Sequence, residues 1–167
     1  MFKGCTSLTN VNLDNVILTE NVTSMISSFE DCMSLQIIDL TNIDTTNINS
    51  FENMFKGCIN LSEITGLEVI SLDNANSLSC MLEGTRLVEL DLSNWNLSNV
   101  SNISGLFKDC DLLTKLNLNT WNLQSVSSYD ETFEGCTSLK HIDMYDCDDS
   151  TFIIIPPILP VRDLDDL

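Results

Sequence analysis

A unit of 26 or 27 residues recurs along most of this chain, and its periodicity constrains the fold more than any other feature. Its clearest mark is the pattern L-x-x-L-x-L. A hydrophobic residue fills the middle position of each copy: Val11, Ile38, Ile64, Leu90, Leu116 and Ile142. A repeat of this size cannot bury its apolar face alone, so neighbouring repeats have to pack on one another. The periodicity therefore predicts a solenoid.

Each repeat has two halves with different periodicity. The first half alternates apolar and polar residues, as in the segment 89–92, which is typical of a β-strand. In the second half, Val100, Ile103 and Phe107 are spaced so that they share one face of a helix. We therefore expect each repeat to contain one strand and one short helix.

A residue that tolerates the left-handed conformation follows each predicted helix. Glycine fills this position in four repeats and aspartate in two: Gly4, Asp31, Gly57, Gly84, Asp109 and Gly135. Glycine has no Cβ to clash in that conformation, and aspartate adopts it more readily than most residues. We expect these residues to end the helices.

Cysteine follows that position in five repeats, and threonine in the sixth: Cys5, Cys32, Cys58, Thr85, Cys110 and Cys136. Stacked side chains lie about 4.8 Å apart, whereas a disulfide brings its Cβ atoms to about 3.8 Å. Free cysteine behaves as a small hydrophobe, and we favour this role over disulfides. Cys80 lies outside this row and is a candidate surface thiol.

The segments 1–8, 54–61 and 133–139 contain the sequence M-F-x-G-C-x-x-L or a close variant of it. With the pattern L-x-x-L-x-L, they resemble the BspA-like leucine-rich repeats of bacterial surface proteins. The resemblance covers residues 1–146. It implies an α/β solenoid, a leucine-rich-repeat-like right-handed coil with a parallel β-sheet on one face and short helices on the other. It implies no catalytic residues.

The chain is expected to divide into two parts. Residues 1–146 form the solenoid of six coils, the first of them incomplete, and residues 147–167 form an extended apolar and acidic tail. Three prolines in the tail prevent a helix and discourage a central strand. The tail either caps the last coil or docks on another protein. The candidate docking residues are Phe152, Ile153, Ile154, Ile155, Pro156, Pro157, Ile158 and Leu159.

The formal net charge of −18 at pH 7 limits the kinds of partner. Nucleic acid and anionic lipid attract clustered Lys and Arg, so we expect neither as a partner. A basic protein partner fits the charge. Direct membrane insertion is not expected, because no apolar run is long enough to span a membrane. A homo- or hetero-oligomer could form through the uncapped first coil or the tail.

The resemblance implies a cell-surface or extracellular location. The N-terminus enters a repeat directly and has no signal peptide, which leaves a virus particle or the cytoplasm as alternatives.

Outward residues of the predicted strands form columns across the sheet, because residues two apart point to the same face. The candidate partner-binding residues are Asn12, Asp39, Glu63, Glu89, Asp91, Asn117, His141 and Asp143. These columns could bind a basic peptide or a divalent cation. The alternative is a solvated sheet surface that binds nothing.

No set of residues indicates catalysis. His141 is the only histidine, and no serine or cysteine is spaced from it as in a catalytic triad. The acidic segment 146–149 lacks the glycine and distal glutamate of a calcium loop. We therefore expect no enzymatic activity, no cofactor and no metal. The sequence favours a non-enzymatic protein–protein interaction module resembling surface adhesins. The alternative is a structural assembly component, such as a minor virion protein or an intracellular scaffold, that docks through its ends.

Overall fold

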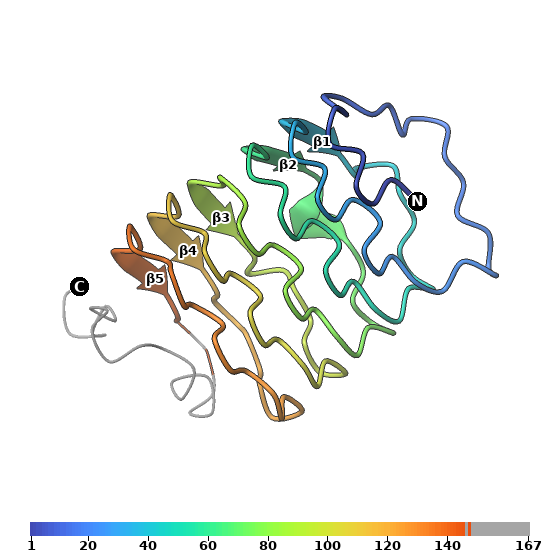
Figure 1. The fold of residues 1–167 in the computed structure, drawn as a ribbon. Helices are drawn as coiled ribbons and strands as arrows, with labels where there is room; N and C mark the ends of the chain where they lie inside the picture. The colour runs from blue at the N-terminus through green and yellow to red at the C-terminus, as the bar shows by residue number, and fades with distance from the viewer. Residues whose placement is uncertain (146, 148–167) are drawn as a thin grey trace.

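The computed structural model describes residues 1–145 and residue 147. Along this part of the chain, five strands of three residues each lie in chain order on one side of the molecule (Figure 1). They are β1 (Ile37–Asp39), β2 (Glu63–Thr65), β3 (Glu89–Asp91), β4 (Lys115–Asn117) and β5 (His141–Asp143), and a 3-10 helix, η1, spans Leu67–Val69. The strands form two parallel sheets, β1–β2 and β3–β4–β5.

The α/β solenoid predicted from the sequence is wrong. Among the described residues there is no α-helix, and strands and irregular turns make up nearly all of the chain. Two small parallel sheets replace the single continuous sheet that was expected. The segments predicted as helices are series of turns.

Left-handed residues explain why these segments are not helices. In one of them, Asn53 and Gly57 have φ angles of 55° and 73°, which an α-helix does not accommodate. Each lies at the third position of a four-residue turn, as in a type II turn. The second turn is closed by a hydrogen bond of 3.0 Å from the Cys58 amide to the Phe55 carbonyl. The residues predicted to be left-handed at helix ends do have positive φ, but they end no helix: Gly4, Asp31, Gly57, Gly84, Asp109 and Gly135.

Backbone hydrogen bonds join the turn segments of successive repeats. Every second amide donates to the next repeat, as Phe51 does to Ser77 (3.0 Å) and Phe55 to Met81 (2.9 Å), while the amides between them close local turns. Isolated parallel bridges mark the same contact: Ser24–Ser50, Ser50–Ser77, Ser77–Asn102 and Asn102–Ser128. The Phe2 and Gly4 amides donate in the same way to Ser28 and Glu30, which adds residues 1–4 as a further segment. We call this row of six joined segments the turn ladder.

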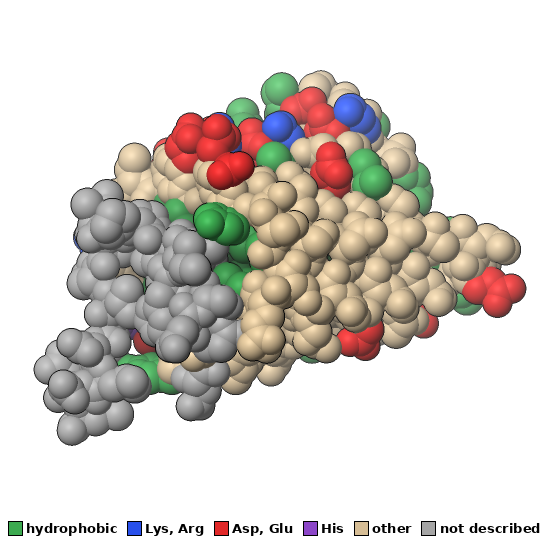
Figure 2. All heavy atoms as spheres, turned by 90° about the horizontal axis from the view of Figure 1, so that it is seen from below, with side chains coloured by type: hydrophobic (Ala, Val, Ile, Leu, Met, Phe, Trp, Pro, Cys, Tyr) green, Lys and Arg blue, Asp and Glu red, His purple; other side chains and the backbone are tan. Residues whose placement is uncertain are grey.

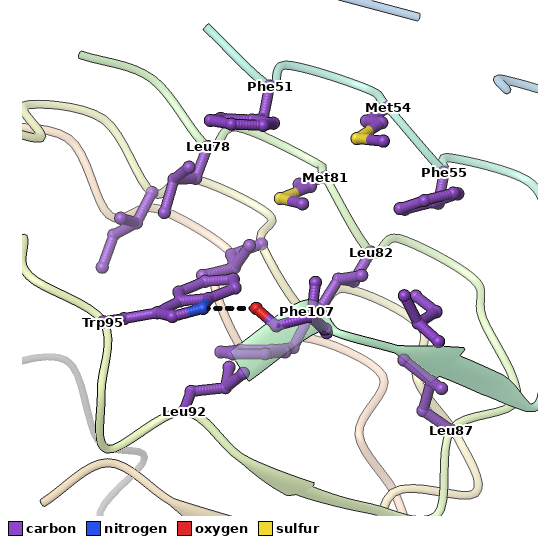
Figure 3. Close-up of a cluster of buried hydrophobic side chains, with 14 of the residues drawn as sticks. Phe51, Met54, Phe55, Leu78, Met81, Leu82, Leu87, Leu92, Trp95 and Phe107 are labelled. Atoms are coloured by element: carbon purple, nitrogen blue, oxygen red, sulfur yellow. Dashed lines mark hydrogen bonds between the residues drawn. The ribbon is translucent and has the colours of Figure 1, made fainter. Parts of the chain in front are cut away.

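The apolar periodicity of the turn segments predicted burial correctly, although it predicted the wrong backbone. Phe55 and Phe107 are 0% exposed and lie in one hydrophobic cluster (Figure 3). The ring of Phe55 stacks on that of Phe29 with centroids 5.5 Å apart, and Phe107 stacks on Phe133 at the same distance. Aromatic pairs at this separation attract each other beyond the burial of their area. The turn ladder is therefore stabilised by side chains as well as by its backbone.

Two tryptophans fill the corner after the strands. The rings of Trp95 and Trp121 lie parallel with centroids 6.2 Å apart, and both side chains are buried. The Trp95 indole donates to the Leu67 carbonyl at 2.9 Å (Figure 3). The Trp121 indole donates to the Leu92 carbonyl at the same distance. Each buried N–H group therefore has a partner in the preceding repeat.

The third repeat interrupts the sheet. Gly66, directly after β2, has a φ of 78° and lies so close to the second repeat that an added Cβ would be 2.6 Å from the Thr41 amide nitrogen. The 3-10 helix η1 follows at once, and β2 does not pair with β3. A hydrogen bond of 2.8 Å from the Arg86 amide to the Leu61 carbonyl still joins the third and fourth repeats.

The first repeat is attached differently from the others. Val11 was predicted to lie in a strand, but it lies outside any strand and is half-buried. Within the described part of the chain, residues 5–22 form no backbone hydrogen bond with another repeat. This repeat is held by apolar side chains against the core: Leu8, Val11, Leu13, Leu18 and Val22. The outer edge of β1 is therefore open.

Candidate interaction face

The outward side chains of the strands form two columns. The first residue of each strand contributes to the first-position column, which contains Ile37, Glu63, Glu89, Lys115 and His141. The third residue contributes to the third-position column, which contains Asp39, Thr65, Asp91, Asn117 and Asp143. Parallel pairing places members of a column opposite each other within each sheet, as Glu89 with Lys115 and Lys115 with His141. The middle residues point inward, and Ile38, Leu116 and Ile142 are no more than 1% exposed.

Seven of the eight predicted partner-binding residues lie in these columns, and Asn12 does not. Asn12 lies outside the strands, and its side-chain oxygen accepts a hydrogen bond of 2.8 Å from the Asp14 amide. Within the first-position column Glu63 adjoins Ile37, and in the third-position column Asp91, Asn117 and Asp143 are consecutive. The candidate docking tail, Phe152 to Leu159, lies outside the described residues.

Carboxylates of the third-position column accept hydrogen bonds from the turns that follow their strands. Asp39 accepts a hydrogen bond of 2.8 Å from the Thr41 amide. Asp91 accepts from the Ser93 hydroxyl (2.6 Å) and the Ser93 amide (3.1 Å). These bonds favour the ionised form, so the Thr41 hydroxyl and amide lower the pKa of Asp39, and the Ser93 hydroxyl and amide lower that of Asp91. These side chains are therefore held against their own backbone.

The first-position column contains charges that have no such anchor. Glu63, Glu89 and Lys115 are exposed, and none of their side chains forms a hydrogen bond or ion pair with another described residue. Their backbones are fixed by strand pairing, while their side chains extend into solvent. These three residues are the side chains of the face that are most available to a partner. The sequence suggested the column but not this difference in availability.

A histidine–aspartate pair lies at the end of the face. The Nε2 atom of His141 is 2.8 Å from an Asp143 oxygen, and the two side chains are 30% and 14% exposed. Both residues belong to β5, where their spacing of two positions directs them to the same side. The carboxylate thus orients the imidazole at a surface position.

A column of alternating charge runs along the turn ladder, and the sequence analysis missed it. The position before each left-handed glycine or aspartate is filled by Lys3, Glu30, Lys56, Glu83, Lys108 and Glu134. Ion pairs join neighbours in this column, with nitrogen–oxygen distances of 2.7 Å, 2.9 Å and 3.2 Å for Lys3–Glu30, Lys56–Glu83 and Lys108–Glu134. Figure 2 shows acidic and basic side chains interspersed along one side of the molecule. The charged residues at the x position of the pattern M-F-x-G-C are the sequence signal that could have revealed this column.

These ion pairs shift the pKa values of their members in the expected directions. The hydrogen bond from Lys3 lowers the pKa of Glu30, and the hydrogen bond to Glu83 raises the pKa of Lys56. Lys108 lies 2.6 Å from Glu131 as well as contacting Glu134, and its pKa is raised by both. The column holds neighbouring repeats in register but leaves few unpaired charges for a partner.

The cysteine row is buried and chemically quiet. Cys5, at the start of the row, is the exception, because it is exposed. The other four thiols each donate to a carbonyl of the preceding repeat, as Cys58 does to Phe29 at 3.0 Å and Cys136 to Phe107 at 2.9 Å. Burial raises the pKa of both thiols to about 12, so neither is ionised near neutral pH. The thiols of Cys5, Cys32, Cys58, Cys80, Cys110 and Cys136 form no disulfide, and Cys80, predicted as a surface thiol, is half-buried.

No group of three or more His, Cys, Asp or Glu side chains among the described residues could hold a metal ion. No helix in that part of the chain is long and apolar enough to cross a membrane.

The fold and the face thus define a protein made of successive copies of one short unit. A family model described as "Mycoplasma protein of unknown function, DUF285" matches residues 1–74 and residues 23–147. The chain belongs to this family. The two matches overlap, as expected when a model can align to a repeated sequence in more than one register. A search of the curated proteins found no match.

Proposed function

We propose that this chain is a non-enzymatic protein–protein interaction module that binds another protein on its strand face. The observation that supports this most directly is the set of exposed, unpaired charges at Glu63, Glu89 and Lys115. They project from paired strands, so a partner would meet them in a fixed arrangement. The resemblance to BspA-like repeats of bacterial surface proteins agrees with such a role.

Charge favours a partner with basic groups. The chain has 25 acidic and 7 basic residues, and two of the three unpaired charges on the face are glutamates. Opposite charges across an interface raise the association rate and suppress wrong partners. The ionised carboxylates of Asp39 and Asp91 add to the negative potential, although their turns hold them in place.

A structural assembly component that docks through an end of the chain is the second candidate. The outer edge of β1 supports it, because β1 pairs with no described strand there and an unpaired strand edge is a template for another strand. Residues 5–22 form no backbone hydrogen bond with another described repeat. A minor virion protein or an intracellular scaffold would use such an edge.

Site-specific photocrosslinking in native cells separates these two candidates. A photoreactive residue at position 89 would label the partner of the strand face, and one at position 37 would label a partner at β1. Position 134, in the charge column of the turn ladder, is the matched control. We expect labelling at position 89, and we expect the captured protein, once purified, to bind the variant Glu63→Gln/Glu89→Gln more weakly than the variant Glu134→Gln. Equal labelling at positions 89 and 134 would contradict the proposal.

A further inference from the structure

The charges of the first-position column are arranged in two blocks. Going from β2 to β5, the column contains Glu63 and Glu89 and then Lys115 and His141. The acidic block is therefore followed by a block of nitrogen donors, and the boundary lies between β3 and β4. When the column is laid against a copy of itself in reverse order, acidic side chains lie opposite nitrogen donors.

We infer that the strand face binds a second copy of this chain face to face, about a two-fold axis that runs parallel to the strands between β3 and β4. This inference rests on the proposed function and names the partner of the same face. Rotation about that axis reverses the order of the strands in the second copy. The first-position columns of the two copies then face each other, and so do the third-position columns. Glu89 then faces Lys115 of the second copy. Glu63 lies on the side of β5 of the second copy, but β2 is not paired with β3, so Glu89 and Lys115 carry the complementarity. An interface of this symmetry repeats each contact twice.

The third-position column does not oppose the same arrangement. Asp91 faces Asn117 of the second copy, so a carboxylate lies opposite an uncharged amide group. Within one chain the Asn117 side chain already hydrogen-bonds Asp91, and its oxygen accepts from the Asn119 amide, so this column adds no new bond to the dimer. Asp91 and Asn117 thus bring no like charges together.

Three other placements of the axis bring like charges together. An axis through β3 places Glu89 opposite Glu89 of the second copy, and an axis through β4 does the same for Lys115. An axis between β2 and β3 places Glu63 on the side of Glu89. Like charges in contact oppose association, and only the axis between β3 and β4 brings Glu89 opposite Lys115.

The high net charge opposes any association of two copies, but its effect is local at physiological salt. The screening length is about 8 Å there, so charges remote from the face interact weakly. Exposed ion pairs are individually weak, and we expect the dimer to form at high micromolar to millimolar concentration.

Sedimentation equilibrium of the full chain at physiological salt provides the test, because reversing either charge at the boundary should abolish the dimer. The variants Glu89→Lys and Lys115→Glu should each lower the association constant at least about tenfold, since the two-fold axis applies each change twice. The double variant Glu89→Lys/Lys115→Glu should restore association. Both positions are exposed, and an unchanged melting temperature confirms that each variant is folded.

Mixing the two single variants gives the sharpest readout. Each fails to pair with itself, but the reversed charges of one complement those of the other, so the mixture should form a heterodimer. A wild-type chain that remains monomeric at millimolar concentration overturns the inference. Failure of the mixture to associate overturns it as well. In both cases the photocrosslinking result at position 89 still shows whether the face binds a different protein.

Discussion

The strand side and the turn side of the repeats differ in continuity. On the strand side, pairing stops between β2 and β3 and leaves two sheets. On the turn side, bridges run without a break from Ser24 to Ser128. The close approach at Gly66 and the 3-10 helix η1 that follows thus change the sheet but not the turn ladder. The turn ladder therefore joins the repeats, while the strand side can vary and present different residues to a partner.

The largest expected effect tests whether the interrupted sheet depends on the close approach at Gly66. An added Cβ at Gly66 would lie 2.6 Å from the Thr41 amide nitrogen, whereas one at Gly4 would meet nothing within 4 Å. Both glycines have positive φ, so Gly4→Ala controls for conformational strain. We expect Gly66→Ala to reduce the free energy of unfolding by on the order of 4 kcal/mol, and Gly4→Ala by about 1–2 kcal/mol. Urea denaturation measures both, and equal losses would contradict the role of the close approach.

A pair of core truncations compares the two sides directly. Phe55 on the turn side is 0% exposed, whereas Leu90 on the strand side is half-buried. Phe55→Ala should cost about 3–5 kcal/mol, and Leu90→Ala should cost about 1–2 kcal/mol because less apolar surface and a smaller cavity are involved. Chemical denaturation of the two variants gives the ranking. A larger loss for Leu90→Ala would show that the strand side contributes more to stability than we infer.

Amide exchange should reveal a third difference, between the first repeat and the rest. Residues 5–22 form no backbone hydrogen bond to another described repeat, whereas the Phe51 and Phe55 amides donate to the next repeat. Segments with few hydrogen bonds and partial burial open at low free energy. We expect the amides of the first repeat to exchange about a hundredfold faster than those of the turn ladder. Equal protection would indicate that the first repeat is joined to β1 in solution.

The smallest expected effect concerns the turn after β3 and depends on pH. The Ser93 hydroxyl lowers the pKa of Asp91, so Asp91 has a lower pKa folded than unfolded, where about 3.9 is usual. The resulting stability is present above that unfolded value and is lost as the pH falls through the folded pKa. Ser93→Ala should therefore cost up to about 1 kcal/mol at pH 7, since the site is exposed, and less at pH 3.

Ser98→Ala is the matched control for that experiment. The Ser98 hydroxyl donates to the Asn96 oxygen at 2.7 Å, in the same geometry but to a group that does not titrate. Denaturation curves at the two pH values should show a pH-dependent loss for Ser93→Ala and a constant loss for Ser98→Ala. The same pH dependence in both variants would assign the effect to the net charge of the chain.

The spacing of the sequence predicted most residues of the strand face, but it did not predict which of their side chains are available to a partner. A period of 26 residues placed Glu89, Lys115 and His141 in one column, and strand pairing confirmed it. The engagement of Asp39 and Asp91 by their own turns depends on backbone geometry two residues further on, which no periodicity contains. Asn12 matched the pattern as well as the others, yet it lies outside any strand.

The repeat length, the inward row of hydrophobes and the left-handed positions follow from the order of the residues alone. They are properties of single residues, recurring at a regular interval, and need no knowledge of neighbours. Only the packed structure shows that the apolar spacing of the second half is satisfied by tight turns and not by a helix. Two left-handed residues four positions apart, as at Asn53 and Gly57, direct alternate amides to the next repeat, and those contacts between repeats exist only once the chain has folded.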